Sequence, residues 1–169
     1  MGFRSVRVLS KVIAIANQKG GVGKTTTAIN LSSCLAVKGK KVLILDIDPQ
    51  GNTTSGLGIE KTKIEKSIYD VLINGEDIKN AIYNTVVENL EICPSNIELA
   101  GAEVELVPVI ARENRLKNAL AHIRNDYEYV IIDCPPSLGL LTVNALTAAN
   151  TILVPIQCEY YALEGLSQL

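Results

Sequence analysis

A glycine-rich segment near the start of the chain is the part of the sequence best suited to chemistry. It reads Gln18-Lys19-Gly20-Gly21-Val22-Gly23-Lys24-Thr25-Thr26 and lies between an apolar run and a helical pattern. Glycines let backbone N–H groups converge on phosphate oxygens, and a helix that begins near Lys24 directs its positive end at the same anion. Lys24 can reach the β and γ phosphates, and the Thr25 hydroxyl can join the ligands of Mg²⁺. The segment predicts a phosphate-binding loop, because a turn that merely capped a helix would not require Gly-Lys-Thr.

The loop departs from the usual pattern at its first position. In the pattern G-x-x-x-x-G-K-[ST], residue 18 would be glycine, but it is Gln18, and an additional cation follows at Lys19. The Lys19 side chain cannot easily fold back onto phosphates that its own loop already surrounds. It could reach a nucleotide held by a second subunit, which would link catalysis to dimerisation. A surface lysine without a role is the alternative that the spacing leaves open.

Two acidic segments follow further apolar runs. Asp46-Ile47-Asp48-Pro49-Gln50-Gly51-Asn52 follows one of them, and Asp133 ends Val130-Ile131-Ile132-Asp133. Carboxylates at the C-terminal ends of strands lie where open α/β sheets bind their ligands. Asp48 could orient a water for in-line attack or hold Mg²⁺ through a water, and Asp133 is expected to support the metal. Asp48 is preferred to Asp46 for catalysis because Asp46 is expected inside the strand. Helix capping or loop solvation is the alternative for either segment.

These segments must be positioned by alternating strands and helices. Nearly continuous apolar runs predict strands buried on both faces, as in parallel sheets. These strands are Val12–Ala16, Lys41–Asp46, Leu90–Cys93, Tyr129–Asp133 and Thr151–Pro155. Helices are predicted at Thr25–Lys38, from a Ser67 cap through Ile73, at Arg112–Arg124, at Gly139–Ala149 and again from Glu159. The predicted fold class is α/β: an open, mostly parallel, doubly wound sheet with helices on both faces, as in P-loop NTPases.

The composition is that of an ordinary globular chain. Of 169 residues, 47% are hydrophobic and 20% charged, and the formal net charge is −2. The apolar content excludes a disordered chain, and the charge excludes a wholly basic nucleic-acid binder. One domain is expected over residues 12–169, after a basic extension at residues 1–11. The cytoplasm is the expected compartment, because no apolar run is long enough for a membrane span or a signal peptide.

Other residues with reactive side chains are interpreted as structural. The cysteines lack the spacing of zinc or iron–sulfur ligands and are expected to be reduced and buried. They are Cys34, Cys93, Cys134 and Cys158. His122, the only histidine, falls in a helical pattern and is expected on the surface or packed in the core. Glu103, Glu105 and Glu113 are expected on solvated helix faces.

Taken together, three segments resemble the motifs of the ParA/Soj partition ATPases. Lys19–Thr26 looks like the deviant Walker A loop with its signature lysine. Asp46–Asn52 and Ile131–Pro136 look like the companion motifs, and all three occur in the family's order. The resemblance covers the chain from about Val12 to its end.

The resemblance implies an ATP-dependent homodimer that encloses two nucleotides, with Mg²⁺ as the metal. Lys19 would reach the phosphates bound by the second subunit, while Lys24 and Thr25 would hold phosphate and metal. Asp48 would position the attacking water, and Asp133 would support the metal. The resemblance also implies that the ATP-bound dimer binds DNA without sequence preference, on the nucleoid. A ParB-like partner would stimulate hydrolysis, and no membrane would take part.

Length separates this sequence from that family, whose members continue further. The sequence is expected to lack the C-terminal part, which would carry the last strands, adenine contacts and DNA-binding residues. Two alternatives therefore stay open beside the partition ATPase. One is a nucleotide-gated binding module with negligible turnover, and the other is a MinD-like regulator of cell division. The residues do not distinguish adenine from guanine.

Overall fold

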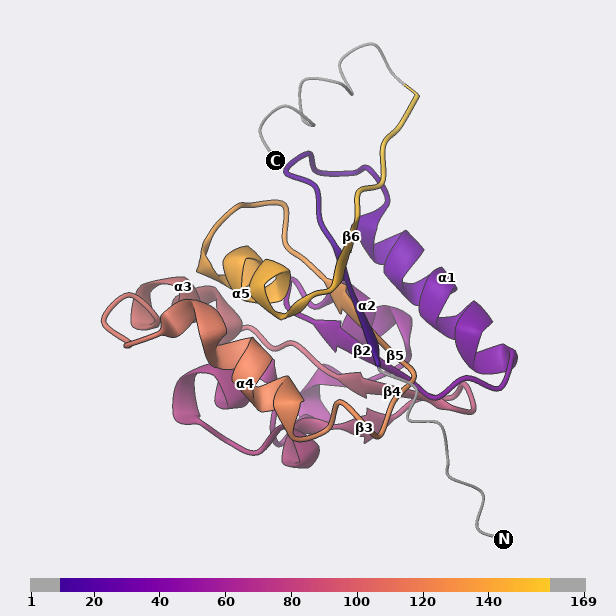
Figure 1. Ribbon diagram of the computed structural model, residues 1–169, viewed down its shortest axis with the longest axis horizontal. Helices are drawn as coiled ribbons and strands as arrows, with labels where there is room; N and C mark the ends of the chain where they lie inside the picture. The colour runs from indigo at the N-terminus through magenta and orange to yellow at the C-terminus, as the bar shows by residue number, and fades with distance from the viewer. Residues whose placement is uncertain (1–9, 159–169) are drawn as a thin grey trace, which may run out of the picture.

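A six-stranded sheet forms the centre of the computed structural model, which describes residues 10–158 (Figure 1). Its strands are β1 (Lys11–Ile15), β2 (Val42–Asp46), β3 (Tyr83–Asn84), β4 (Leu90–Cys93), β5 (Tyr129–Asp133) and β6 (Thr151–Leu153). Their order across the sheet is β3-β4-β2-β5-β1-β6, and the neighbours are parallel except β3 with β4. The C-terminal ends of β1, β2 and β5 therefore meet at one edge, where such sheets bind ligands.

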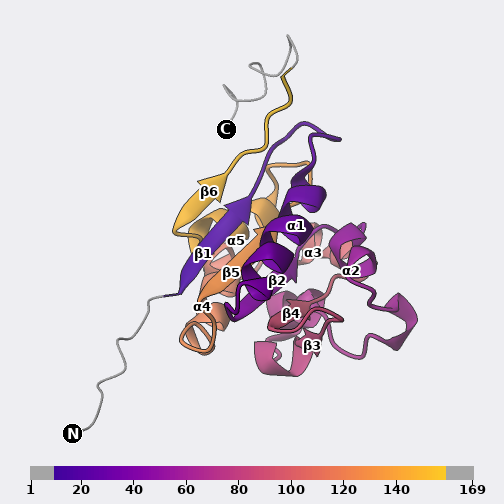
Figure 2. The same ribbon diagram turned by 90° about the vertical axis from the view of Figure 1, so that its right-hand side faces the viewer.

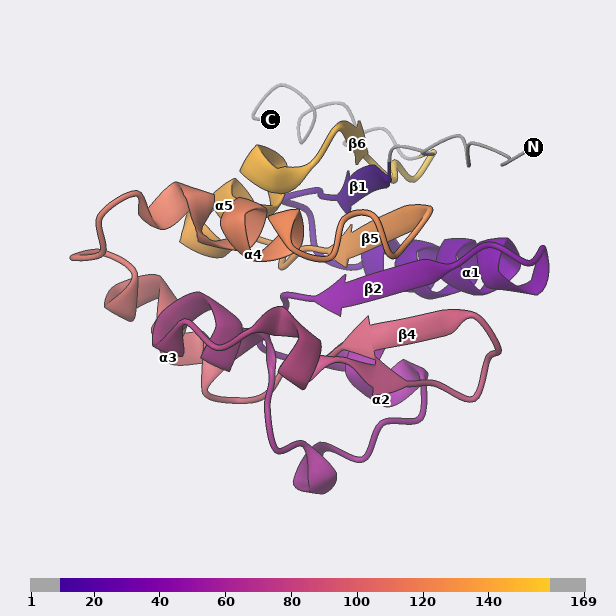
Figure 3. The same ribbon diagram turned by 60° about the horizontal axis from the view of Figure 1, so that its bottom comes forward.

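Helices cover both faces of this sheet (Figures 2 and 3). Helix α1 (Lys24–Val37) packs on one face, and α4 (Arg115–Ala121) and α5 (Leu140–Ala148) pack on the other. Alternate strand residues supply the two cores, so that Val12 and Ala14 face α5 while Ile13 and Ile15 face α1. The remaining elements are α2 (Asn52–Gly56), α3 (Leu99–Glu105), η1 (Lys61–Lys63), the π-helical turn η2 (Asp70–Asn74), η3 (Ile78–Ala81) and η4 (Arg112–Asn114).

The predicted fold class is confirmed, and the strand predictions are close to the observed bounds. The strands Leu90–Cys93 and Tyr129–Asp133 have the bounds that the sequence predicts. The last strand ends at Leu153 rather than Pro155, because β1 is its one neighbour within residues 10–158 and Leu153 already pairs with the last residue of β1, Ile15.

Four of the five predicted helices coincide with observed helical elements, although their bounds differ. Helix α1 ends before Gly39, whose φ of 78° is the left-handed conformation typical of glycine after a helix. The Ser67 hydroxyl accepts a hydrogen bond from the Tyr69 N–H at 3.2 Å, and the turn that follows widens into η2. The helix predicted at Arg112–Arg124 is shorter, since it divides into η4 and α4 and ends at Ala121.

Several features differ from the sequence predictions or lie outside the described residues. The bounds of α2, α3 and β3 were not predicted, because each is too short to show a periodic pattern, although Glu103 and Glu105 of α3 are expected on a helix. Cys93 and Cys134 are buried as predicted, but Cys34 and Cys158 are exposed. The basic extension, apart from its last two residues, and the helical pattern from Glu159 lie outside the described residues. No helix in residues 10–158 is long and apolar enough to cross a membrane.

The sequence places Glu103 on a solvated helix face. In the structure this residue is half-buried and caps another helix. Its carboxylate accepts the N–H groups of Leu140 at 2.7 Å and Leu141 at 3.3 Å, at the start of α5. The N-cap residue, Gly139, has no side chain to do this, and a Cβ there would collide with the Glu103 carboxylate. A carboxylate from α3 thus satisfies the first donors of α5 and fixes the end of the loop that follows β5.

Replacing Glu103 by alanine is expected to lower the free energy of unfolding by about 1–2 kcal/mol, because the half-buried start of α5 loses its acceptor. Urea denaturation measures the change. Glu105→Ala is the matched control, because this exposed carboxylate on the same helix accepts a hydrogen bond from the Tyr69 hydroxyl and caps no helix within residues 10–158. The expected loss in free energy of unfolding is below about 0.5 kcal/mol. Equal losses in the two variants would contradict the capping role.

Candidate phosphate-binding site

The glycine-rich loop joins β1 to the first residue of α1, Lys24. Gly21 and Gly23 have φ angles of 73° and 89°, which glycine adopts without the strain that a side chain would add. Gly23 is the N-cap of α1, and no side chain caps the helix. The first N–H groups of α1 are therefore directed at the space above the loop, as the sequence predicts for an anion site.

The segment after β6 runs beside the loop and supports it (Figure 1). The Asn17 amide donates to the carbonyl of Pro155 at 2.8 Å, and the Gln157 amide donates to the carbonyl of Gly21 at 3.0 Å. The side-chain oxygen of Asn17 also accepts the N–H of Lys19 at 2.9 Å. These bonds attach the loop to the segment that follows β6 and order its first residues.

Lys24 is a nearly buried cation at the base of the loop. Only 7% of its surface is exposed, and its Nζ donates to the carbonyl of Lys19 at 3.1 Å. Loss of water around the ammonium lowers the pKa of Lys24, while the charges of Asp133 and Asp48 act in the opposite direction. A poorly hydrated ammonium beside the helix start is well placed to bind an anion.

Asp133 lies beneath Thr25 and is the most enclosed of the predicted metal-supporting groups. One carboxylate oxygen, Oδ2, accepts the hydroxyls of Thr25 at 2.8 Å and Thr53 at 2.7 Å. The other oxygen, Oδ1, is buried and has no hydrogen-bond partner. Burial raises the pKa of Asp133, and the two hydroxyl hydrogen bonds partly oppose that shift. The carboxylate therefore has one oxygen engaged and one left for a further ligand.

The two aspartates that follow β2 have different surroundings. Asp46 is the last residue of the strand and fully buried, and it accepts the hydroxyl and N–H of Thr54 at 2.7 and 2.8 Å. Asp48 faces the cleft above the loop and accepts the N–H of Gln50 at 2.9 Å. The expectation that Asp46 lies inside the strand is confirmed. Asp48 is therefore the one of the pair that can meet a ligand.

A cleft of about 370 Å³ lies above the loop. Its lining residues are Gly20, Gly21, Gly23, Lys24, Thr25, Thr26, Asp48, Gln50, Asn52 and Pro136. Six of the eight predicted nucleotide-binding residues are among them; Lys19 and Val22 are not, and Val22 is buried. Asp133 is not part of the lining but accepts the hydroxyl of Thr25, which is. The structure thus brings the phosphate loop, Asp48 and Asp133 together at one edge of the sheet.

Some residues of the site were not singled out from the sequence. Gln50 and Asn52 lie in the quoted acidic segment, so their place in the lining could have been predicted from their distance to Asp48. Pro136, three residues after Asp133, also lines the cleft. No neighbouring residue in the sequence marks Thr53 as part of the site, because its hydrogen-bond partner, Asp133, is 80 positions away along the chain.

The residues present fit a magnesium ion better than a zinc ion. Among residues 10–158 no group of three or more His, Cys, Asp or Glu side chains could hold a metal. Mg²⁺ needs no such cage, since it keeps several waters and takes one or two protein oxygens together with phosphate oxygens. The Thr25 hydroxyl and the unpartnered Oδ1 of Asp133 are oxygen donors of that kind.

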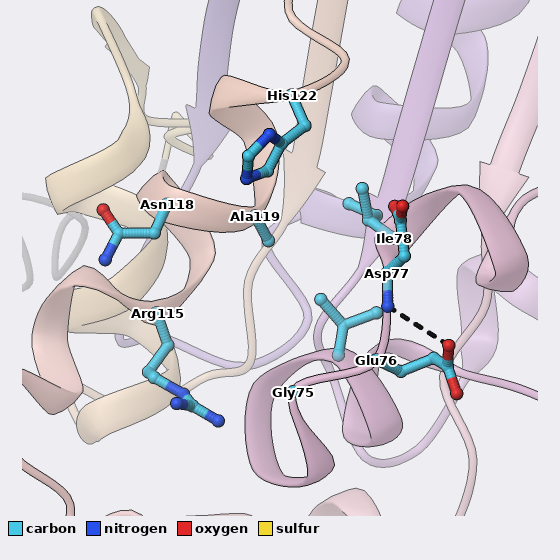
Figure 4. Close-up of a pocket in the computed structure, with 9 residues that line it drawn as sticks. Gly75, Glu76, Asp77, Ile78, Arg115, Asn118, Ala119 and His122 are labelled. Atoms are coloured by element: carbon cyan, nitrogen blue, oxygen red, sulfur yellow. Dashed lines mark hydrogen bonds between the residues drawn. The ribbon is translucent and has the colours of Figure 1, made fainter.

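A second cleft of about 370 Å³ lies between α4 and the turns η2 and η3, and it offers different chemistry (Figure 4). His122 is exposed at its margin, as a surface residue. The Arg115 guanidinium already donates to the carbonyls of Leu72 and Ile73 at 2.8 and 3.2 Å. Glu76 is paired with Lys66 at 3.4 Å. In this cleft the charged groups of Arg115 and Glu76 thus already have partners within the protein.

Comparison with known proteins agrees with this geometry. The profile of a family described as an AAA domain matches residues 10–169. The chain is 63% identical over 161 residues to the sporulation initiation inhibitor protein Soj of Bacillus subtilis, covering 95% of this chain and 64% of Soj. It is 54% identical over 168 residues to the chromosome partitioning protein ParA of Myxococcus xanthus, covering 99% of this chain and 59% of ParA. The chain therefore spans about three fifths of the length of these curated relatives.

Solved structures share the fold. A cobyrinic acid a,c-diamide synthase from Mycobacterium smegmatis with bound ADP and magnesium has a TM-score of 0.90 and 46% identity, covering 95% of this chain and 65% of that one. An ATP complex of McdA from Cyanothece has a TM-score of 0.88 and 29% identity, covering 94% of this chain and 61% of that one. These similarities support the prediction of a P-loop NTPase fold.

Asp46 gives a prediction for the pH dependence of stability. Burial raises the pKa of Asp46 to about 7, despite its hydrogen bonds to Thr54, whereas an aspartate in an unfolded chain titrates near 3.9. Between these values the folded state holds a proton that the unfolded state has lost, so its stability falls as the pH rises from about 4 to about 7. Asp46→Asn cannot titrate and is expected to lose less stability over this interval, by a few kcal/mol. Urea denaturation across the interval measures both proteins; parallel curves would show that Asp46 titrates normally.

Proposed function

The chain belongs to the AAA-domain family that includes the partition proteins Soj and ParA, and on that basis we propose that it is a Mg²⁺-dependent ATPase of the chromosome- or plasmid-partitioning type. Residues 12–169 would form its nucleotide-binding domain. The observation that carries the proposal is the arrangement of one cleft: Lys24 and Thr25 line it, and Asp133 is bonded to Thr25 from below. The ADP, ATP and magnesium of the similar structures support an adenine nucleotide and this metal.

In this proposal the loop binds the phosphates and the metal. The backbone N–H groups of Gly20–Thr26 and the Lys24 ammonium would bind the phosphate oxygens, and each charge-assisted hydrogen bond contributes about 1.5–3 kcal/mol. The Thr25 hydroxyl would ligate Mg²⁺, and Asp133 would hold it through a water, using the oxygen that has no partner. Mg²⁺, when bound, neutralises charge on the phosphates. Lys24 would exchange the Lys19 carbonyl for an anionic partner.

Asp48 is the residue we assign to the attacking water. It lines the cleft, and its carboxylate is fixed by the N–H of Gln50. A carboxylate held in this way can accept a hydrogen bond from a water and orient it toward the terminal phosphate. Asp48 could also bind a water of the Mg²⁺ shell, so its carboxylate would serve both orientation and charge balance.

The proposed working form is an ATP-dependent homodimer. Lys19 would reach the phosphates of the second subunit, since its side chain is not part of the cleft of its own chain. The names of the relatives support a role in partition. We further propose that the whole protein acts in the cytoplasm on nucleoid DNA, and that a ParB-like partner stimulates hydrolysis.

Binding and turnover test this function directly. Isothermal titration with ATP and MgCl₂ should register saturable binding, and a phosphate-release assay should detect hydrolysis that requires Mg²⁺ and increases with DNA and a ParB-like partner. Saturable binding without turnover would leave a nucleotide-gated binding module. No binding to well-folded protein would refute the nucleotide site itself.

Asp48→Ala is expected to bind Mg·ATP with unchanged affinity but to hydrolyse it at least about 100-fold more slowly, because the attacking water loses its acceptor. Single-turnover kinetics separate the chemical step from binding. Asp126→Ala removes an exposed carboxylate remote from the cleft, whose ion pair with Lys79 is long at 3.9 Å, and should hydrolyse ATP at the normal rate. An unchanged kcat in Asp48→Ala would assign the water to another residue.

Lys19→Ala is expected to bind ATP as a monomer but to lose ATP-dependent dimerisation, because the second subunit's phosphates lose a cation. Analytical ultracentrifugation with Mg·ATP measures the association. Lys24→Ala serves as the contrasting variant, since it should lose nucleotide binding altogether. Normal ATP-dependent dimers of Lys19→Ala would show that the lysine does not act across the subunits.

A further inference from the structure

Two adjacent threonines of α2 each bind a different buried carboxylate. Thr53 and Thr54 are fully buried, although Asn52 and Ser55 on either side are exposed. The Thr53 hydroxyl donates to Oδ2 of Asp133 at 2.7 Å, and the Thr54 hydroxyl and N–H donate to Oδ2 of Asp46. A five-residue helix is thus held at its start by two buried carboxyl groups on two different strands.

The register of the sheet makes this double attachment possible. Strands β2 and β5 are parallel neighbours, and Asp46 pairs with Asp133 as the last residue of each. Two carboxylates in register on adjacent strands lie about one strand spacing apart, roughly 5 Å. Consecutive side chains of one helical turn can span that separation.

The oxygen that Thr53 binds is also bound by the phosphate loop. Oδ2 of Asp133 accepts the Thr25 hydroxyl at 2.8 Å and the Thr53 hydroxyl at 2.7 Å, so one atom connects the starts of α1 and α2. Oδ1 of the same carboxylate is buried without a partner and belongs to the proposed metal site. A change in the charge around Asp133 therefore acts on both hydroxyls.

The segment from Asp48 to Thr53 is short and internally bonded. Asp48 accepts the N–H of Gln50 on its side chain and that of Gly51 on its carbonyl, both at 2.9 Å. Gly51 in turn is the N-cap of α2, and its carbonyl accepts the N–H of Ser55 at 3.1 Å. Asp48 and α2 are therefore linked as one unit, and what holds Thr53 also holds Asp48.

We infer that Thr53 is a positioning residue, which fixes the Asp48 segment to Asp133 and so couples the metal-supporting carboxylate to the residue that orients water. The inference rests on the proposed function for its catalytic consequence. The bonds that carry it belong to the protein without ligand. Thr53 itself would touch neither nucleotide nor metal, since it does not line the cleft.

The first test separates positioning from binding. Thr53→Val keeps the shape of the side chain and removes the hydroxyl, and Thr53→Ala is a second hydroxyl-free variant should valine impair folding. We expect a fall in kcat of about 10- to 100-fold with a KM for Mg·ATP within about threefold of the original, because the lost bond is to a charged acceptor. Thr53→Ser retains the hydroxyl and should restore kcat. Ser55→Ala, on the same helix but exposed, is the matched control and should leave both constants unchanged.

The second test does not require turnover. Amide hydrogen exchange is measured with and without AMP-PNP and MgCl₂, in the original chain and in Thr53→Val. Binding should protect both residues 20–26 and residues 48–54 in the original chain, and only residues 20–26 in the variant. Equal protection of residues 48–54 in both proteins, or an unchanged kcat in a folded hydroxyl-free variant, would overturn the coupling. Absence of any protection in the original chain would instead refute the proposed nucleotide site.

Discussion

Two carboxylates buried at the ends of adjacent parallel strands are the constraint on which the site depends. Burying an ionised carboxylate costs several kcal/mol unless hydrogen bonds compensate for the lost water. Asp46 and Asp133 are in register and fully buried, so donors must come to them from the loops above the sheet. The threonines at residues 25, 53 and 54 provide those donors, and each belongs to a segment that the site must hold in place. The hydrogen bonds that lower the cost of burying the carboxylates therefore also hold together the segments around the cleft.

The hydrogen bonds do not fully offset the cost of burying these charged groups. Burial raises the pKa values of both Asp46 and Asp133 in spite of their hydrogen bonds, and it lowers the pKa of Lys24. Each of these shifts shows that water stabilised the charged form better than the folded protein does. A polyanion with a divalent cation would supply charge of both signs in the same space. Lys24 and Asp133 thus carry opposite charges beside one cleft, which suits the phosphate and magnesium of the proposed function.

The sequence predicts those parts of this arrangement that depend on neighbouring residues. Strand cores such as Leu90–Cys93 are continuous apolar runs, and the phosphate loop is a contiguous motif, so both are visible without tertiary information. The bonds that position the site are of another kind. The Thr53–Asp133 and Glu103–Leu140 contacts join residues 80 and 37 positions apart, and they depend on strand register and helix packing. Cys34 shows the same limit, because an apolar neighbourhood in the sequence does not reveal which face of α1 it occupies.

The shared oxygen of Asp133 explains how a small cleft can connect several segments. In the interior, charges are weakly screened, so a cation that approaches Oδ1 changes the acceptor strength of Oδ2 on the same carboxylate. Thr25 and Thr53 both depend on that atom, and through them the starts of α1 and α2 respond together. The second cleft, of similar volume, has different chemistry, since the Arg115 guanidinium donates to backbone carbonyls and Glu76 is paired with Lys66 near the surface. What distinguishes the candidate phosphate site is therefore a fully buried carboxylate oxygen that the starts of two helices share, and not the amount of space.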